Sequence, residues 1–228
     1  MEIIVIAILL VTIVLLKYIF KIDIKKVEPL KEDKELEKLT DRFPENVQIA
    51  EEMLKMLGNE KVKIEEAKNT GTSLYIAVTD KISIADMKNN YARIQTIAHE
   101  CMHSVQDRRL LLFNFIFSNI NIIYLVAAII LTATKVIENT ILQVFILTLF
   151  AFIRFAVRGL LEIDAMTKSK YLAKEYIESK KILNKEQITS IIAKYEEINK
   201  IGIPFIIAQL LTSSILGILV YAIVSLVL

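Results

Sequence analysis

The stretch from Leu110 to Thr134, which is 25 residues long and carries no charge, constrains the fold of this chain most strongly. Arg108 and Arg109 precede it, and Lys135 follows it. Because a helix rises about 1.5 Å per residue, roughly 20 apolar residues suffice to cross the hydrocarbon core of a bilayer. The stretch therefore predicts a transmembrane helix. Composition agrees, since 54% of the 228 residues are hydrophobic and the mean hydropathy is +0.50.

Three further apolar stretches predict a mainly α integral membrane protein with about four transmembrane helices. Residues 1–20 form an expected N-terminal anchor, residues 110–161 a transmembrane hairpin, and residues 203–228 a C-terminal transmembrane helix. A cleavable signal peptide is the alternative for the first stretch. The start Met1-Glu2 lacks a basic region and no small-residue cleavage site follows, which favours a retained anchor.

The distribution of positive charge predicts an orientation. Of the 28 lysines and arginines, 16 lie in residues 21–109 and nine in residues 158–202. By the positive-inside rule, both of these segments lie in the cytoplasm and both termini lie outside. The expected location is therefore the cell membrane, with several crossings and the lipid bilayer as a partner. A net charge of +2 gives no indication of nucleic acid.

Residues 21–109 predict a small cytoplasmic α+β domain. Its expected elements are a mixed-charge linker or helix face over 25–37, a helix over 44–57 that stops at Gly58, strands over 62–65 and 73–79, a turn over 69–72, and a strand or turn over 81–84. Asp86 is the expected N-cap of the next helix.

That next helix carries the sequence His99-Glu100-Cys101-Met102-His103, an H-E-x-x-H pattern that contains the only two histidines of the chain. Residues four apart share one face of a helix, so both imidazoles can bind one metal ion. Glu100 lies beside them, where its carboxylate can take a proton from water that the metal activates. Cys101 faces away from the histidine pair.

A catalytic zinc ion needs a third protein ligand, and without a third histidine this ligand has to be a carboxylate. Glu162 is the best candidate, because it directly follows the third apolar stretch, and an antiparallel hairpin brings the two helix ends together. Asp164 is the alternative. Two histidines and one carboxylate suit Zn²⁺, at one ion per chain.

The segment Ala98 to Gln106, together with Glu162-Ile163-Asp164-Ala165, resembles the YugP-like neutral zinc metallopeptidases and, more distantly, the HtpX-type membrane proteases. The resemblance covers most of the chain. It implies a zincin-like (gluzincin) domain in which His99, His103 and Glu162 bind zinc and Glu100 is the general base. The HtpX-type pattern has an aspartate where this chain has Met166, so the resemblance leaves Asp164 or Asp107 to orient a histidine ligand.

Two further segments complete the sequence-based prediction. Tyr75, Ile76, Ala77 and Val78 form a strand candidate that, at a sheet edge, could bind an extended peptide; an interior strand without substrate contact is the alternative. Residues 162–202 form the expected cytoplasmic helical segment, amphipathic over 166–200. Its isoleucines (177, 182, 188, 191 and 192) could pack on the domain, although a lysine-rich solvated face is the favoured interpretation of this segment.

The predicted function is that of a membrane-embedded zinc metalloendopeptidase that cleaves unfolded or membrane-associated polypeptides at the cytoplasmic membrane surface. A zinc-binding membrane scaffold without turnover is the alternative.

Overall fold

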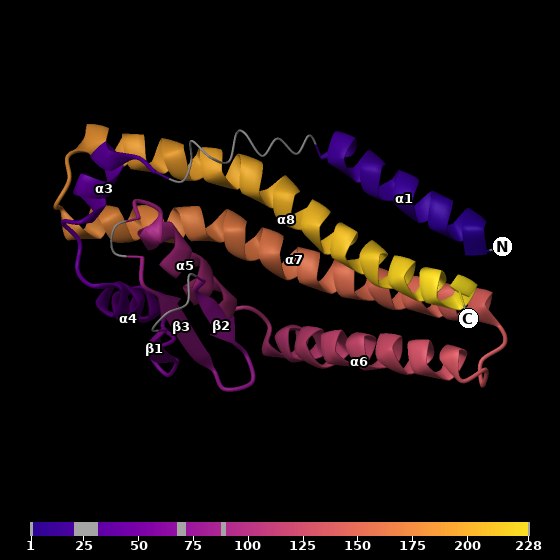
Figure 1. Cartoon of the computed structure of the whole chain (residues 1–228). Helices are drawn as coiled ribbons and strands as arrows, with labels where there is room; N and C mark the ends of the chain where they lie inside the picture. Colours follow the sequence, from indigo (N-terminus) through magenta and orange to yellow (C-terminus); the bar gives the residue numbers. More distant parts are fainter. Residues whose placement is uncertain (1, 21–31, 68–71, 88–89, 228) are drawn as a thin grey trace. The chain divides into compact units, whose positions relative to one another are not determined.

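The structure is a computed structural model that describes residues 2–20, 32–67, 72–87 and 90–227. The described chain is mostly helical and contains one three-stranded sheet (Figure 1). Most of the expected turn over residues 69–72, and the first part of the mixed-charge segment, lie outside the described residues. The chain divides into two compact units, one made of 1–22, 113–160 and 204–228 and the other of 23–112 and 161–203.

Four helices supply the apolar stretches, and each is long and apolar enough to cross a membrane. They are α1 (Glu2–Ile19), α6 (Arg108–Ala133), α7 (Thr140–Lys180) and α8 (Lys185–Val227). In the most apolar 18-residue stretch of each helix, only 6 to 22% of the residues are buried. Most of these side chains therefore face outward, as lipid-facing residues do. The structure confirms the prediction of four helices that are long and apolar enough to cross a membrane. The orientation of the chain in the membrane stays a prediction.

Polar side chains inside the first unit bond to one another. The Tyr124 hydroxyl donates to Oε1 of Gln143, and the hydroxyls of Thr132 and Tyr221 lie 3.0 Å apart. Internal hydrogen bonds of this kind are what a bilayer requires, because lipid tails offer no partners to polar groups.

The helices α7 and α8 are longer than the sequence patterns predict. The segment 166–200 is not one amphipathic helix: α7 runs unbroken to Lys180, a turn follows with Lys181 at φ 54°, and α8 begins at Lys185. Of the isoleucines in this segment, 177 and 191 are fully buried, 188 and 192 pack on the core, and 182 is partly exposed. Packing of these isoleucines on the second unit is therefore confirmed for four of the five.

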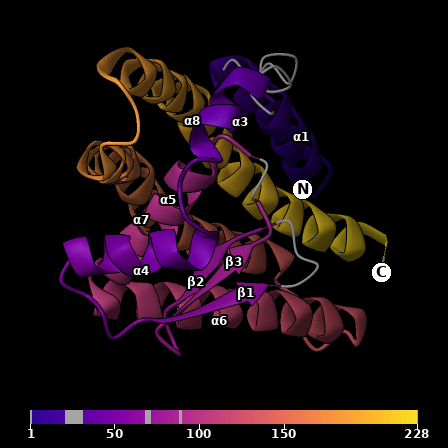
Figure 2. The ribbon, with the colours of Figure 1, turned by 90° about the vertical axis from the view of Figure 1, so that its left-hand side faces the viewer.

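The second unit contains the sheet and the remaining helices. These elements are α3 (Lys34–Thr40), α4 (Asn46–Met56), β1 (Lys63–Ala67), β2 (Leu74–Ile76), β3 (Lys81–Ala85) and α5 (Arg93–Ser104). The strand order is β1-β3-β2, with β1 parallel and β2 antiparallel to β3, so β2 lies at one edge. The helices α4 and α5 pack against each other and against the sheet (Figure 2).

Two sequence predictions about this unit need correction. The strand expected over 73–79 ends at Ile76, because Ala77–Asp80 form the turn to β3, with Asp80 at φ 51°. The motif helix begins at Arg93 and not near Asp86. The side chain of Asn90 closes the turn before it by accepting from the backbone N–H of Ala92. The helix α4 and its stop at Gly58, where φ is +67°, agree with the prediction.

A buried arginine fixes the chain between α3 and α4. Arg93 is 1% exposed, and its guanidinium donates to the backbone carbonyls of Thr40, Phe43 and Pro44 and to Oδ1 of Asn46. Because a buried charge without partners is costly, these bonds hold the α3–α4 loop against the start of the motif helix.

Candidate metal centre

The helix α5 presents its two histidines on one side and its apolar residues on the other. Ile94, Ile97 and Cys101 are fully buried in the core of the second unit. His99 and His103 lie one turn apart on another face, with their Nε2 atoms 3.1 Å apart. Ile94, Ile97 and Cys101 are spaced three and four residues apart, and the two histidines are spaced four apart, so each set lies along its own face of the helix.

Glu162 of α7 completes a group of three side chains. Its Oε2 lies 3.4 Å from Nε2 of His99 and 3.7 Å from Nε2 of His103. Glu162 and His103 are buried, whereas His99 keeps part of its surface exposed. The structure thus brings together the three residues that the sequence predicts as ligands, and this group could hold a metal ion.

The distances within the group test whether it fits zinc. Ligand atoms held tetrahedrally at about 2.0–2.1 Å from an ion lie roughly 3.3–3.4 Å from one another. The three separations here are 3.1, 3.4 and 3.7 Å, which bracket this value. Two imidazoles and one carboxylate are also a donor set that suits zinc. The residues therefore fit the ion.

Gln106 is a residue of this site that the sequence patterns do not single out. Its Oε1 lies 2.8 Å from Nδ1 of His103, and its Nε2 donates to the carbonyl of Leu161 at 2.8 Å and to Oδ2 of Asp164 at 3.0 Å. Since an amide oxygen only accepts, Nδ1 of His103 carries the proton and Nε2 keeps its lone pair for a metal. Gln106 is the last residue of the segment that carries the family resemblance, but neither the H-E-x-x-H pattern nor the helical period assigns it a role, since α5 ends at Ser104.

The two expected orienting aspartates have different positions. Asp164 acts through Gln106, so it reaches His103 by one intervening side chain. Asp107 lies elsewhere, because its Oδ1 accepts from the backbone N–H groups of Arg109 and Leu110 at the start of α6. Capping α6 therefore replaces the orienting role that the resemblance allowed for Asp107.

Glu100 is buried beside the histidines, with 6% of its surface exposed. Burial raises the pKa of its carboxyl, while His99, His103 and a backbone hydrogen bond from Tyr75 act in the opposite direction without cancelling the rise. The pKa of His103 is raised as well: burial alone would lower it, but the contacts with Glu162 outweigh that effect.

The edge strand β2 reaches this site through Tyr75. Its backbone bonds to the Glu100 carboxylate, and its hydroxyl donates to Oδ1 of Asp80 at 2.8 Å. Burial and the Asp80 contact raise the pKa of Tyr75 to about 12, so the phenol stays protonated at neutral pH. Of the four predicted strand residues, Tyr75 and Ile76 lie in β2, whereas Ala77 and Val78 lie in the following turn. Among the described strands, β3 alone pairs with β2.

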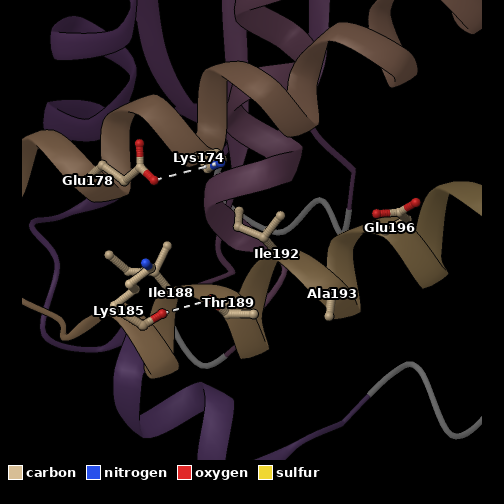
Figure 3. A pocket seen from close by; sticks show the side chains of 8 residues that line it. All are labelled: Lys174, Glu178, Lys185, Ile188, Thr189, Ile192, Ala193 and Glu196. Carbon is tan, nitrogen blue, oxygen red and sulfur yellow. Dashed lines mark hydrogen bonds and ion pairs between the residues drawn. The ribbon is translucent and has the colours of Figure 1, made fainter.

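A pocket of about 420 Å³ lies between the C-terminal part of α7 and the first turns of α8 (Figure 3). Its lining consists of Lys174, Glu178, Lys185, Ile188, Thr189, Ile192, Ala193 and Glu196. None of these residues belongs to the candidate metal centre, so this pocket is not the space beside the histidines.

Comparisons with protein families, with curated proteins and with solved structures find no match to this chain. The resemblance to the YugP-like metallopeptidases therefore stays a prediction from the motif residues.

Proposed function

We propose that this protein is a membrane-embedded zinc metalloendopeptidase of the gluzincin type, related to the YugP-like metallopeptidases. The observation that carries the proposal is the group formed by His99, His103 and Glu162 with the buried Glu100 beside it. A site that only stabilised the fold would have no use for a buried carboxylate next to three ligands, because burying a charge is costly.

The residues of the chain divide the chemistry among them. His99, His103 and Glu162 would hold the ion, and a zinc ion there would supply Lewis-acid polarisation of the scissile carbonyl and activation of water. Glu100 accepts the proton of the attacking water and then delivers it to the leaving amine. Glu100 is not one of the three grouped ligands, so its carboxylate is available for this role.

The proposed substrate is an extended polypeptide. The strand β2 lies at a sheet edge, and its Tyr75 bonds to Glu100, so a peptide paired along β2 would pass beside the base. His103 precedes α6 by only five residues, and Glu162 lies within α7, so the ligands are close in sequence to apolar stretches. This placement favours unfolded or membrane-associated polypeptides, cleaved on the cytoplasmic side that the lysines and arginines predict.

The test compares the wild-type protein with Glu100→Gln in detergent, using an unfolded protein as substrate. We expect Glu100→Gln to retain zinc and to lose cleavage by several orders of magnitude, because the amide cannot accept the proton. Glu51→Gln, which changes an exposed glutamate of α4, is the matched control and should cleave like the wild type. Equal cleavage by wild type and Glu100→Gln would refute the peptidase and favour the zinc-binding scaffold instead.

A further inference from the structure

Two aliphatic side chains are exposed in and near the turn between β2 and β3. Val78, within the turn, is 48% exposed, and Leu74, at the start of β2, is 47% exposed. In contrast, Ile82 and Ile84 of β3 are buried. Single exposed aliphatic residues are ordinary on a protein surface, so the meaning of these two depends on what lies beside the turn.

An ion pair ties this turn to the first residue of α6. Oδ2 of Asp80 lies 3.8 Å from Nη1 of Arg108, and Oδ1 of the same carboxylate accepts the Tyr75 hydroxyl. The turn, Tyr75 and Arg108 all belong to the second unit. Figure 1 shows the loop that joins β2 and β3 beside the start of α6. Whatever surrounds the first turn of α6 therefore also adjoins this loop.

The start of α6 is the place where an apolar helix meets a polar segment. Arg108 and Arg109 open the helix, and uncharged residues follow from Leu110 to its end. Arginines at such a boundary lie at the level of the lipid headgroups, with their stems along the apolar region. Val105, three residues before Arg108, is also 40% exposed. Each partner of the ion pair therefore has an exposed aliphatic residue two or three positions before it in the chain, Val78 before Asp80 and Val105 before Arg108.

We propose that the turn Ala77–Asp80 docks into the interfacial layer of the bilayer at the N-terminal end of α6, with Val78 and Leu74 among the headgroups and upper acyl chains. The pairing of Asp80 with Arg108 neutralises the one carboxylate of the turn, which lowers the cost of bringing it to the lipid. This inference goes beyond the proposed function, because it requires neither zinc nor peptidase activity.

Docking of this turn would connect the lipid surface to the candidate metal centre through β2. The strand that ends in the lipid-contacting turn is the strand whose Tyr75 bonds to Glu100. A polypeptide segment lying in the interfacial layer would therefore meet the edge of β2 without first leaving the membrane surface.

The chain contains no tryptophan, so a single introduced tryptophan reports on its own surroundings without background. The experiment places Val78→Trp in the full-length protein and reconstitutes it into vesicles of phosphatidylcholine and phosphatidylglycerol. Half of the samples carry lipids brominated near the headgroup end of the acyl chain, and half carry lipids brominated near the methyl end. Bromine quenches tryptophan only at short range, so the two lipid sets measure depth.

Two matched variants frame the result. Ile182→Trp changes a partly exposed aliphatic residue in the α7–α8 turn, roughly 30 Å along α7 from Glu162, and should stay unquenched. Phe115→Trp lies in the apolar part of α6, is 50% exposed in the wild type, and should be quenched strongly.

We expect Val78→Trp to emit at shorter wavelength than Ile182→Trp and to be quenched several-fold more by the shallow bromines than by the deep ones. Emission and quenching equal to those of Ile182→Trp would overturn the inference. A blue shift that depends on protein concentration, without quenching by lipid, would also overturn it, because a second copy would then cover the turn. Loss of quenching at Phe115→Trp would remove α6 from the bilayer and refute the inference at its basis.

Discussion

At the scale of single residues, the amide of Gln106 decides which nitrogen of His103 is free to bind a metal. The amide oxygen fixes the proton on Nδ1, and its own NH₂ group is held by Asp164 and the Leu161 carbonyl. Partners of this kind are known to matter nearly as much as the ligands, because they orient the imidazole and fix its tautomer.

We therefore expect Gln106→Ala to lower zinc affinity by about 10–100-fold while the fold is kept. Competition with a chromophoric chelator measures the affinity, and circular dichroism checks the fold. Gln48→Ala changes a glutamine of α4 that donates to Glu52 on the same helix, so it should bind zinc like the wild type. An affinity of Gln106→Ala equal to that of the control would show that the tautomer needs no support.

The choice of Glu162 over Asp164 as third ligand gives a second prediction. Glu162→Ala should lose most of the bound zinc, because its oxygen is the one carboxylate oxygen in the ligand group. Asp164→Ala should weaken binding less, since it acts through Gln106. Zinc content per chain, measured by atomic emission after purification in detergent, distinguishes the two variants. Full retention of zinc by Glu162→Ala, with loss by Asp164→Ala, would reverse the assignment.

At the scale of elements, a carboxylate on α4 bonds to the C-terminal part of α7. Glu52 accepts from the Tyr176 hydroxyl at 2.7 Å and pairs with Nζ of Lys180 at 2.6 Å. Burial alone would raise the pKa of Glu52, but these contacts outweigh it, so the folded protein holds the pKa below its usual value near 4.5. The contact therefore stabilises the fold above that pH, and the stabilisation is lost as the pH falls through the lowered pKa.

Glu52→Gln should lower the free energy of unfolding at pH 7 by at most about 1 kcal/mol, because the pair is partly exposed. The difference from the wild type should shrink as the pH falls below about 4.5, where the unfolded wild-type carboxylate becomes protonated. Chemical denaturation in detergent at several pH values measures it. A difference that grew towards acid pH would contradict a lowered pKa of Glu52 in the folded protein.

The same scale shows where sequence reasoning succeeds and where it stops. Long uncharged runs identify the apolar parts of α1, α6, α7 and α8, because the hydrophobic signal is local. The parallel pairing of β1 with β3 joins residues that are not adjacent in the chain, so no local pattern predicts it.

The residues of the candidate metal centre also divide into those that local sequence patterns predict and those that only tertiary contacts reveal. The H-E-x-x-H spacing and the hairpin select the two histidines and Glu162, because helical period and chain reversal can be recognised in a sequence. The contact of Gln106 with Asp164 is tertiary and leaves no such local pattern. The strand predicted over 73–79 is too long, since the side chains of Ala77 and Val78 give no sign of the turn that Asp80 closes with positive φ.

At the scale of the whole molecule, the distribution of lysine and arginine predicts that the second unit lies in the cytoplasm. The chain offers a clean test, because its single cysteine, Cys101, is buried and burial raises the pKa of its thiol. Cys101 should therefore react little with maleimides.

We expect Glu138→Cys, in the loop between α6 and α7, to react with a membrane-impermeant maleimide on intact cells. Glu196→Cys, an exposed position on α8 in the second unit, should react only after the cells are opened. The reverse pattern of labelling would show that the second unit faces outward, and would place any peptidase activity outside the cell.

The unbroken course of α7 has a mechanical consequence. One helix, α7, carries both the apolar stretch after Thr140 and the carboxylate of Glu162. Helices that are longer or shorter than the hydrocarbon layer adjust by tilting. We therefore expect the thickness of the surrounding lipid to influence Glu162 through α7, so the metal affinity of the site should vary with the length of the acyl chains.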